Sequence, residues 1–148
     1  MQAQVISGTG ETVESRPSTW DVQAGARHAS ERVSHAVRRA EALIAAHPDA
    51  PFTADSLAEA VGVSTRSLSR GFQGLRGYSP MAAVRRARLE RVRLDLLAAA
   101  SDESVTDAAM RWGFFHLGRF SRLYASHFGE LPSATRRRGR APRPPGGC

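Results

Sequence analysis

The chain has 148 residues, 41% of them hydrophobic, which is enough for one compact domain or for two very small ones that share an element. Its net charge is +7, it has no lysine, and the charge is uneven: residues 1–51 hold 5 Arg against 6 acidic residues, whereas residues 52–148 hold 16 Arg against 8. No apolar run approaches the roughly 18 residues that span a bilayer, and a single cysteine, Cys148, excludes an intrachain disulfide and a zinc cluster of thiolates. We therefore expect a cytoplasmic protein without membrane contact, whose basic part binds a polyanion.

The first 50 residues divide into two parts. Residues 1–28 are rich in Gly, Ser, Thr and Gln and have few large apolar side chains, so we expect a disordered lead-in. Between Ser30 and His47, apolar residues recur at steps of three and four, which is typical of one face of a helix. Ser30 is the expected N-cap, and Pro48 ends the helix.

The next segment predicts two short helices around a turn, over about residues 53–77. Thr53 is a good N-cap for the first helix, which stops at Gly62. Ser64 then caps the second helix, and Gly77 closes it. This order is the pattern of a helix-turn-helix.

A long linker helix is predicted over about residues 80–99. Ser79 is its N-cap, and Pro80 occupies the first helical position, where proline is favoured. Its apolar residues form one stripe, and several arginines lie off that stripe: Arg85, Arg86, Arg91 and Arg93.

Residues 104–129 repeat the first helix-turn-helix. AEAVGV at 58–63 matches AMRWGF at 109–114, LSRGF at 68–72 matches FSRLY at 120–124, and GYSP at 77–80 matches GELP at 129–132. The offset is 51 residues up to the glycine of the turn and 52 after it, so the second turn holds one extra residue. A capping box from Ser104 to Asp107 opens this second unit.

No segment alternates polar and apolar residues over a useful length, so the expected fold is all-α with about seven helices. A last short turn begins at Pro132, and the folded domain is expected over residues 29–135. Residues 136–148 are rich in Arg, Pro and Gly, which predicts a disordered basic tail that adds non-specific attraction to phosphate.

The spacing of the repeat favours DNA binding. A small residue on the first helix and a glycine in the turn let two helices cross closely, so that the second helix can enter the major groove. Ala58 with Gly62, and Ala109 with Gly113, fill these roles. The aromatic residues of the second unit are expected in its core: Trp112, Phe114, Phe115, Phe120, Tyr124 and Phe128.

Polar residues at the start of each second helix should then meet base edges. The candidates in the first unit are Thr65, Arg66, Ser69 and Arg70, and those in the second unit are His116, Leu117, Gly118, Arg119, Ser121 and Arg122. Arginine can contact guanine through two hydrogen bonds, and Leu117 can touch a thymine methyl group. A solvated helix face explains each arginine singly, but four arginines at corresponding places in two repeats favour DNA.

These motifs resemble the DNA-binding domain of the AraC/XylS family of bacterial transcription regulators. The resemblance covers residues 53–137 and rests on motifs in both units and in the linker helix. They are LAEAVGVS at 57–64, LSRGF at 68–72, GYSP at 77–80, RLERVR at 88–93, VTDAA at 105–109, WGF at 112–114, GRF at 118–120, Tyr124, and FGELPS at 128–133.

The resemblance implies two helix-turn-helix units on a rigid helix, which read successive major-groove segments of double-stranded DNA. It places base-reading positions at Arg66, Ser69, Arg70, Leu117, Gly118 and Arg122. Gly118 departs from the polar residue usual in the family, which makes Arg119 or His116 its substitute. The family also implies RNA polymerase as a partner.

Members of this family commonly carry a sensory or dimerisation domain ahead of this module, and only some 50 residues precede Thr53 here. We therefore expect either a short stand-alone regulator or a truncated copy, monomeric and without effector, metal or cofactor. The alternative is a degenerate regulator that binds DNA or a partner without activating transcription. An enzyme is not expected, because the sequence shows no nucleophile–base pair and no metal-ligand cluster.

Overall fold

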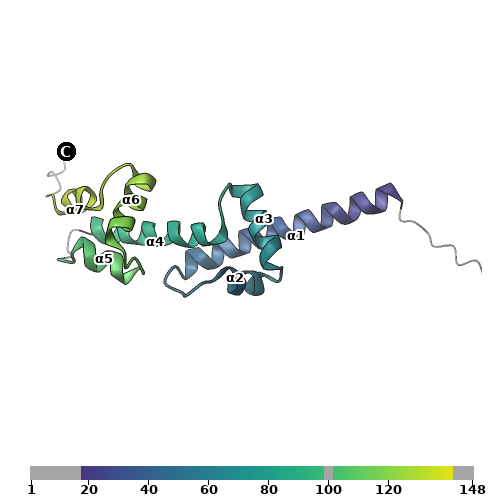
Figure 1. Ribbon diagram of the computed structural model, residues 1–148, viewed down its shortest axis with the longest axis horizontal. Coiled ribbons are helices and arrows are strands. Elements are labelled where there is room, and N and C mark those ends of the chain that lie inside the picture. The colour runs from purple at the N-terminus through teal and green to yellow at the C-terminus, as the bar shows by residue number, and fades with distance from the viewer. Residues whose placement is uncertain (1–17, 99–101, 142–148) are drawn as a thin grey trace, which may run out of the picture.

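The computed structural model describes residues 18–98 and 102–141, and these residues form seven helices and no strand. In chain order the helices are α1 (Thr19–Ala46), α2 (Ala54–Val61), α3 (Thr65–Arg76), α4 (Pro80–Leu97), α5 (Val105–Arg111), α6 (Leu117–Phe128) and α7 (Pro132–Arg140). The molecule is elongated, with α1 at one end, α5 to α7 at the other, and α4 running between them (Figure 1). The all-α prediction is confirmed.

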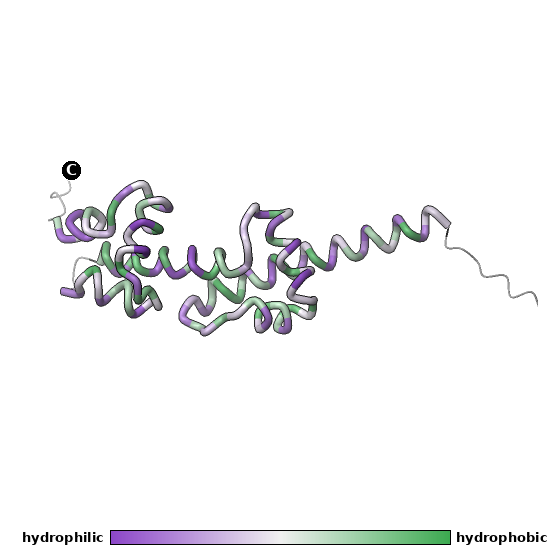
Figure 2. Tube along the Cα trace, in the orientation of Figure 1, coloured by the Kyte–Doolittle hydropathy of each residue, from purple (hydrophilic) through white to green (hydrophobic). Residues whose placement is uncertain are grey.

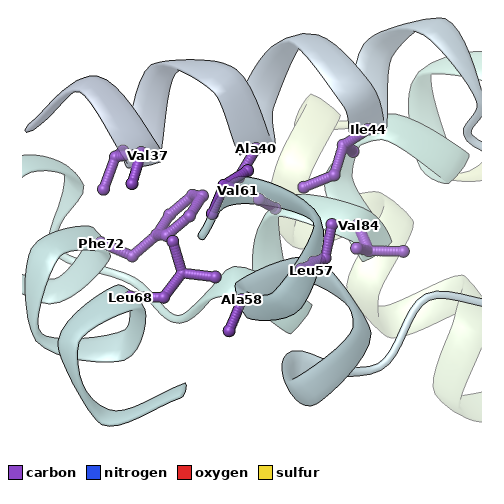
Figure 3. Packing of buried hydrophobic residues seen from close by; sticks show 11 residues of the cluster. Val37, Ala40, Ile44, Leu57, Ala58, Val61, Leu68, Phe72 and Val84 are labelled. Atoms are coloured by element: carbon purple, nitrogen blue, oxygen red, sulfur yellow. The ribbon is translucent and has the colours of Figure 1, made fainter. Parts of the chain in front are cut away.

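Two separate cores divide the chain into two units. In the first unit, α1, α2, α3 and the beginning of α4 bury one apolar cluster (Figure 3). Its members are Ala36, Val37, Ala40, Ile44, Leu57, Ala58, Val61, Leu68, Phe72, Ala83 and Val84. In the second unit, the rest of α4 packs with α5 and α6 around another cluster, formed by Leu89, Val92, Leu96, Ala108, Ala109, Phe120 and Tyr124.

The amphipathic pattern of the helices explains this division. Hydrophobic and hydrophilic residues alternate along α4 and along the helices that line the two cores (Figure 2), as expected of helices that bury one side and expose the other. Along α4 the stripe of buried residues continues from one core into the next, and one straight helix therefore serves both units. No helix among the described residues is long and apolar enough to cross a membrane.

Helix α1 begins twelve residues earlier than predicted. Its first residue is Thr19 rather than the residue after the expected N-cap Ser30, so the expected disordered lead-in is wrong for residues 19–28; residues 1–17 lie outside the described part. Residues 19–32 are exposed, and the helix projects beyond the first unit (Figure 1). The buried half of α1 provides the nucleus from which the helix extends toward the N-terminus. The alanines of the exposed half favour helix formation, and Gly25 lowers the helix propensity by only about 1 kcal/mol relative to alanine.

Helix α7 replaces the predicted short turn and part of the predicted tail. It extends to Arg140 and packs along α4, so closely that a Cβ at Gly139 would lie 2.5 Å from the carbonyl oxygen of Leu96. Arg138 donates to both carboxylate oxygens of Glu130, at 2.7 and 2.8 Å. The prediction of a disordered, solvated run over residues 136–140 is therefore wrong, because these residues form a helix that packs on α4 and pairs with Glu130. Residues 142–148, with Cys148, lie outside the described part.

Candidate nucleic-acid interface

The first helix-turn-helix forms from the predicted caps. Thr53 and Ser56 cap each other reciprocally, with both backbone N–H to hydroxyl distances at 3.0 Å. Gly62 ends α2 in the left-handed conformation, at φ 73°, which glycine adopts without steric cost. The hydroxyl of Ser64 then accepts from the backbone N–H of Ser67 and begins α3. These local hydrogen bonds set the angle at which α3 leaves α2.

Packing determines which side of α3 faces outward. Leu68 and Phe72 are fully buried against the first core, and Gly71 lies so close to α1 that a Cβ there would be 2.5 Å from Val33 Cγ1. The opposite side of α3 is therefore presented to solvent.

The predicted base-reading residues of the first unit lie on or beside that outer side. Arg66 and Arg70 are exposed and are four residues apart, so they share one face. Ser69 is half-buried between them. Thr65 is also half-buried, and its hydroxyl donates to Asp55 Oδ1 at 2.6 Å, which links the start of α3 to α2 and leaves the oxygen as an acceptor.

The second helix-turn-helix has the same design with a longer turn. Ser104 and Asp107 form the predicted capping box at the start of α5, and Gly113 takes the left-handed conformation at φ 83°. Phe114 then turns inward and packs on Phe120, with ring centroids 5.1 Å apart. Three residues separate Gly113 from α6, where two separate the first glycine from α3.

The extra turn residue overturns one prediction. Phe115, expected in the aromatic core, is 72% exposed. Phe114 already fills the position against Phe120, so the next residue points outward. The second unit therefore has an exposed aromatic ring immediately before its outward-facing helix, and the first unit has none at that place.

Helix α6 exposes most of the predicted residues of the second unit. His116, the N-cap, makes no side-chain capping hydrogen bond, and Leu117 is 38% exposed. Arg119 and Arg122 are also exposed, whereas Ser121 is half-buried. Gly118 has no side chain, and nothing lies within 4 Å of the position that its Cβ would occupy. Longer side chains from neighbouring positions can therefore extend over this part of the exposed face of α6.

The arginines fall into two groups by their partners. Several hold the fold together: Arg76 pairs with Glu41 through two hydrogen bonds of 2.6 and 2.8 Å, and Arg138 pairs with Glu130. The arginines on the exposed faces of α3 and α6 form no ion pair within the described residues: Arg66, Arg70, Arg119 and Arg122. Their charge is therefore not compensated by the protein.

A further arginine joins this surface from the linker helix. Arg85 lines a hollow of about 220 Å³ together with His116 and Arg119. From the sequence it was expected only to lie off the apolar stripe of its helix. Sequence spacing within α4 could not have placed it beside α6, because that proximity depends on how the second unit docks.

Comparison with known proteins identifies the family. Residues 57–138 match a family model described as "Helix-turn-helix domain". A solved structure of a probable AraC family transcriptional regulator from Rhodopseudomonas palustris CGA009 is 43% identical, superimposes with a TM-score of 0.68, and covers 71% of this chain and 97% of that one. The chain belongs to the AraC/XylS family. The resemblance inferred from its motifs is thereby confirmed.

Other relatives agree with this assignment to AraC/XylS. The "Probable thc operon regulatory protein" of Rhodococcus erythropolis is 45% identical over 98 residues, which are 66% of this chain and 30% of that protein. The "XylDLEGF operon transcriptional activator 2" of Pseudomonas putida is 44% identical over 82 residues, 55% of this chain and 52% of that one. The chain thus spans between about a third and about a half of the length of these two regulators.

A second solved structure extends the likeness over more of the chain. An AraC-type transcriptional regulator from Chromobacterium violaceum is 29% identical, has a TM-score of 0.63, and covers 81% of this chain and 99% of that one. The arrangement of the two units on one helix is therefore the fold of this family's DNA-binding domain.

Proposed function

We propose that this chain binds double-stranded DNA at specific sequences and regulates transcription, with α3 and α6 in successive major-groove segments. The observation that carries the proposal is the set of exposed arginines on the two equivalent helices that form no ion pair within the described part of the chain: Arg66 and Arg70 on α3, Arg119 and Arg122 on α6. Of these, Arg70 and Arg122 occupy corresponding places in the repeat. The regulatory role of the relatives supports the same conclusion. We also propose a monomer that acts in the cytoplasm, associates with the nucleoid and contacts RNA polymerase.

The dimensions of the linker suit this arrangement. Helix α4 has 18 residues, so it is about 27 Å long at 1.5 Å per residue. Major-groove segments on one side of DNA repeat every 34 Å or so, after 10–10.5 base pairs. Recognition helices held near the two ends of α4 are therefore at a separation that adjacent grooves can accommodate.

The exposed side chains divide into two proposed roles. Arg70 and Arg122 occupy equivalent positions after the turn and are proposed to read guanine, with Arg66, Ser69, Leu117 and the other predicted residues of the two faces around them. Arg85 lies on the linker helix beside Arg119, and it is proposed to bind a phosphate between the two half-sites.

Selection from a randomised DNA library tests the proposal. The wild-type protein should enrich a site with two halves separated by about one turn. Arg70→Ala should remove base preference in one half and Arg122→Ala in the other, each by about 1–3 kcal/mol of discrimination. A phosphate contact behaves differently, so Arg85→Ala should leave the selected motif unchanged and reduce the slope of log K against log salt by about 0.9.

Two results would count against this function. Uniform weak binding by the wild-type protein would show attraction to phosphate without readout. An unchanged motif in both Arg70→Ala and Arg122→Ala would show that α3 and α6 are not the reading helices.

A further inference from the structure

Arg88 lies on the part of α4 that joins the two units. The turn before it contributes Ala83 and Val84 to the first core, and the residues after it contribute Leu89 and Val92 to the second. The extensive contacts between helices all lie within one unit or involve α4. The orientation of one unit against the other therefore depends on this short central stretch of α4 and on any side chain that bridges it.

The Arg88 side chain makes such a bridge. Its Nε donates to the carbonyl oxygen of Pro48 at 3.0 Å, and one Nη donates to that of Ala50 at 2.9 Å. Both acceptors belong to the loop between α1 and α2, in the first unit. The other Nη faces the turn of the second unit, where a Cβ at Gly113 would lie only 3.2 Å away.

The chemistry of this contact suits a rigid connection. A guanidinium group is planar and always charged, and its N–H groups have fixed directions, so two carbonyl acceptors hold it in one orientation. Hydrogen bonds from a charged donor are stronger than neutral ones. Held in this way, the Arg88 side chain is a fixed surface against which the Gly113 turn rests, and this turn sets the direction of α6.

We infer that Arg88 is a positioning residue that fixes the orientation of the two units and thereby selects the spacing between the two half-sites. The spacing statement rests on the proposed DNA-binding function, whereas the orientation statement does not. One base pair inserted between the half-sites rotates them relative to each other by about 35°. A protein whose two units are held in one orientation should bind the altered site much more weakly than the original site. A protein whose units can reorient should bind both sites with similar affinity.

The orientation is tested first, in the free protein. Residual dipolar couplings of backbone amides report whether the two units align as one body. In the wild-type protein both units should fit a single alignment tensor, and in Arg88→Ala they should need tensors of different magnitude. Arg91→Ala is the matched control, because Arg91 is exposed on the same helix and has no hydrogen bond or ion pair within the described residues. A single tensor in Arg88→Ala would overturn the inference.

The spacing is tested with the selected DNA site and with versions that carry one base pair more or fewer between the halves. Loss of the charge-assisted hydrogen bonds should lower the preference of Arg88→Ala for the native spacing by about fivefold or more. Base preference within each half should stay unchanged, as should the spacing preference of Arg91→Ala. Arg88→Lys should resemble Arg88→Ala, because one ammonium group cannot reproduce the two directed bonds.

The outcomes separate the two proposals. Failure of the wild-type protein to select any site would refute the proposed function and leave the coupling measurement to decide the role of Arg88. Selection of a two-part site by the wild-type protein, with the same spacing preference in Arg88→Ala, would refute the role of Arg88 in spacing and leave the function intact.

Discussion

The crossing of α1 and α3 depends on the absence of a side chain at Gly71. A Cβ there would lie 2.5 Å from Val33 Cγ1 and 2.9 Å from Val37 Cγ2, both well inside van der Waals contact. Val37 is fully buried and both valines are stiff about χ1, so neither can move away cheaply. Gly71→Ala should therefore force α3 away from α1.

A second glycine in the same helix isolates this packing cost. Gly74 is exposed, and a Cβ there would meet nothing within 4 Å. Replacement by alanine improves helix propensity by about 0.8–1.0 kcal/mol at either position. The difference between the two variants is then the cost of overpacking alone, which is about 1–3 kcal/mol.

Urea denaturation followed by circular dichroism measures this difference. Gly74→Ala should unfold at higher urea concentration than the wild-type protein, and Gly71→Ala should have a free energy of unfolding about 1–3 kcal/mol below that of Gly74→Ala. Equal free energies of unfolding for the two variants would refute the close approach of α1 and α3.

Two further predictions concern the second unit. Phe115→Ala should change the free energy of unfolding by less than about 0.5 kcal/mol, because its ring is exposed. Phe114→Ala should lower the free energy of unfolding by about 2–4 kcal/mol, because its ring loses the contact with the core. Similar values for the two variants would contradict the orientation of the turn. The hydrogen bonds from Arg138, and then from Thr135, hold the pKa of Glu130 below its ordinary value of 4.5. The stability that Glu130 provides is therefore fully present above pH 4.5 and is lost as the pH falls through its lower folded-state pKa, and Glu130→Gln should flatten the pH dependence of unfolding in that range.

Local chemistry explains which features could be predicted from the sequence. The caps at Thr53, Ser64, Ser79 and Ser104 depend on side chains within three residues of the backbone groups that they satisfy, and all four form as predicted. The repeated pattern of a small residue followed by a glycine likewise predicted the positions of the two turns.

Features that depend on distant partners were not predictable in this way. The run over residues 136–140 looks like a solvated tail in isolation, but its helix packs on α4 and pairs with Glu130. The early start of α1 depends on the buried second half of that helix, whose packing on the first core provides the nucleus from which the exposed first half extends. Arg88 carries no local pattern that would indicate its two acceptors, which lie 38 and 40 residues away.

The shared use of α4 has a consequence for how such a protein can change over time. The exposed residues on the outer faces of α3 and α6 belong to neither core, so under the proposed function each half can acquire a new base preference independently of the other. Insertions or deletions in α4 would instead turn the second unit by about 100° for each residue added or removed. Under the proposed function, preference for individual bases can therefore diverge in each half, whereas a change in the length of α4 would put the second unit out of phase with the next major-groove segment.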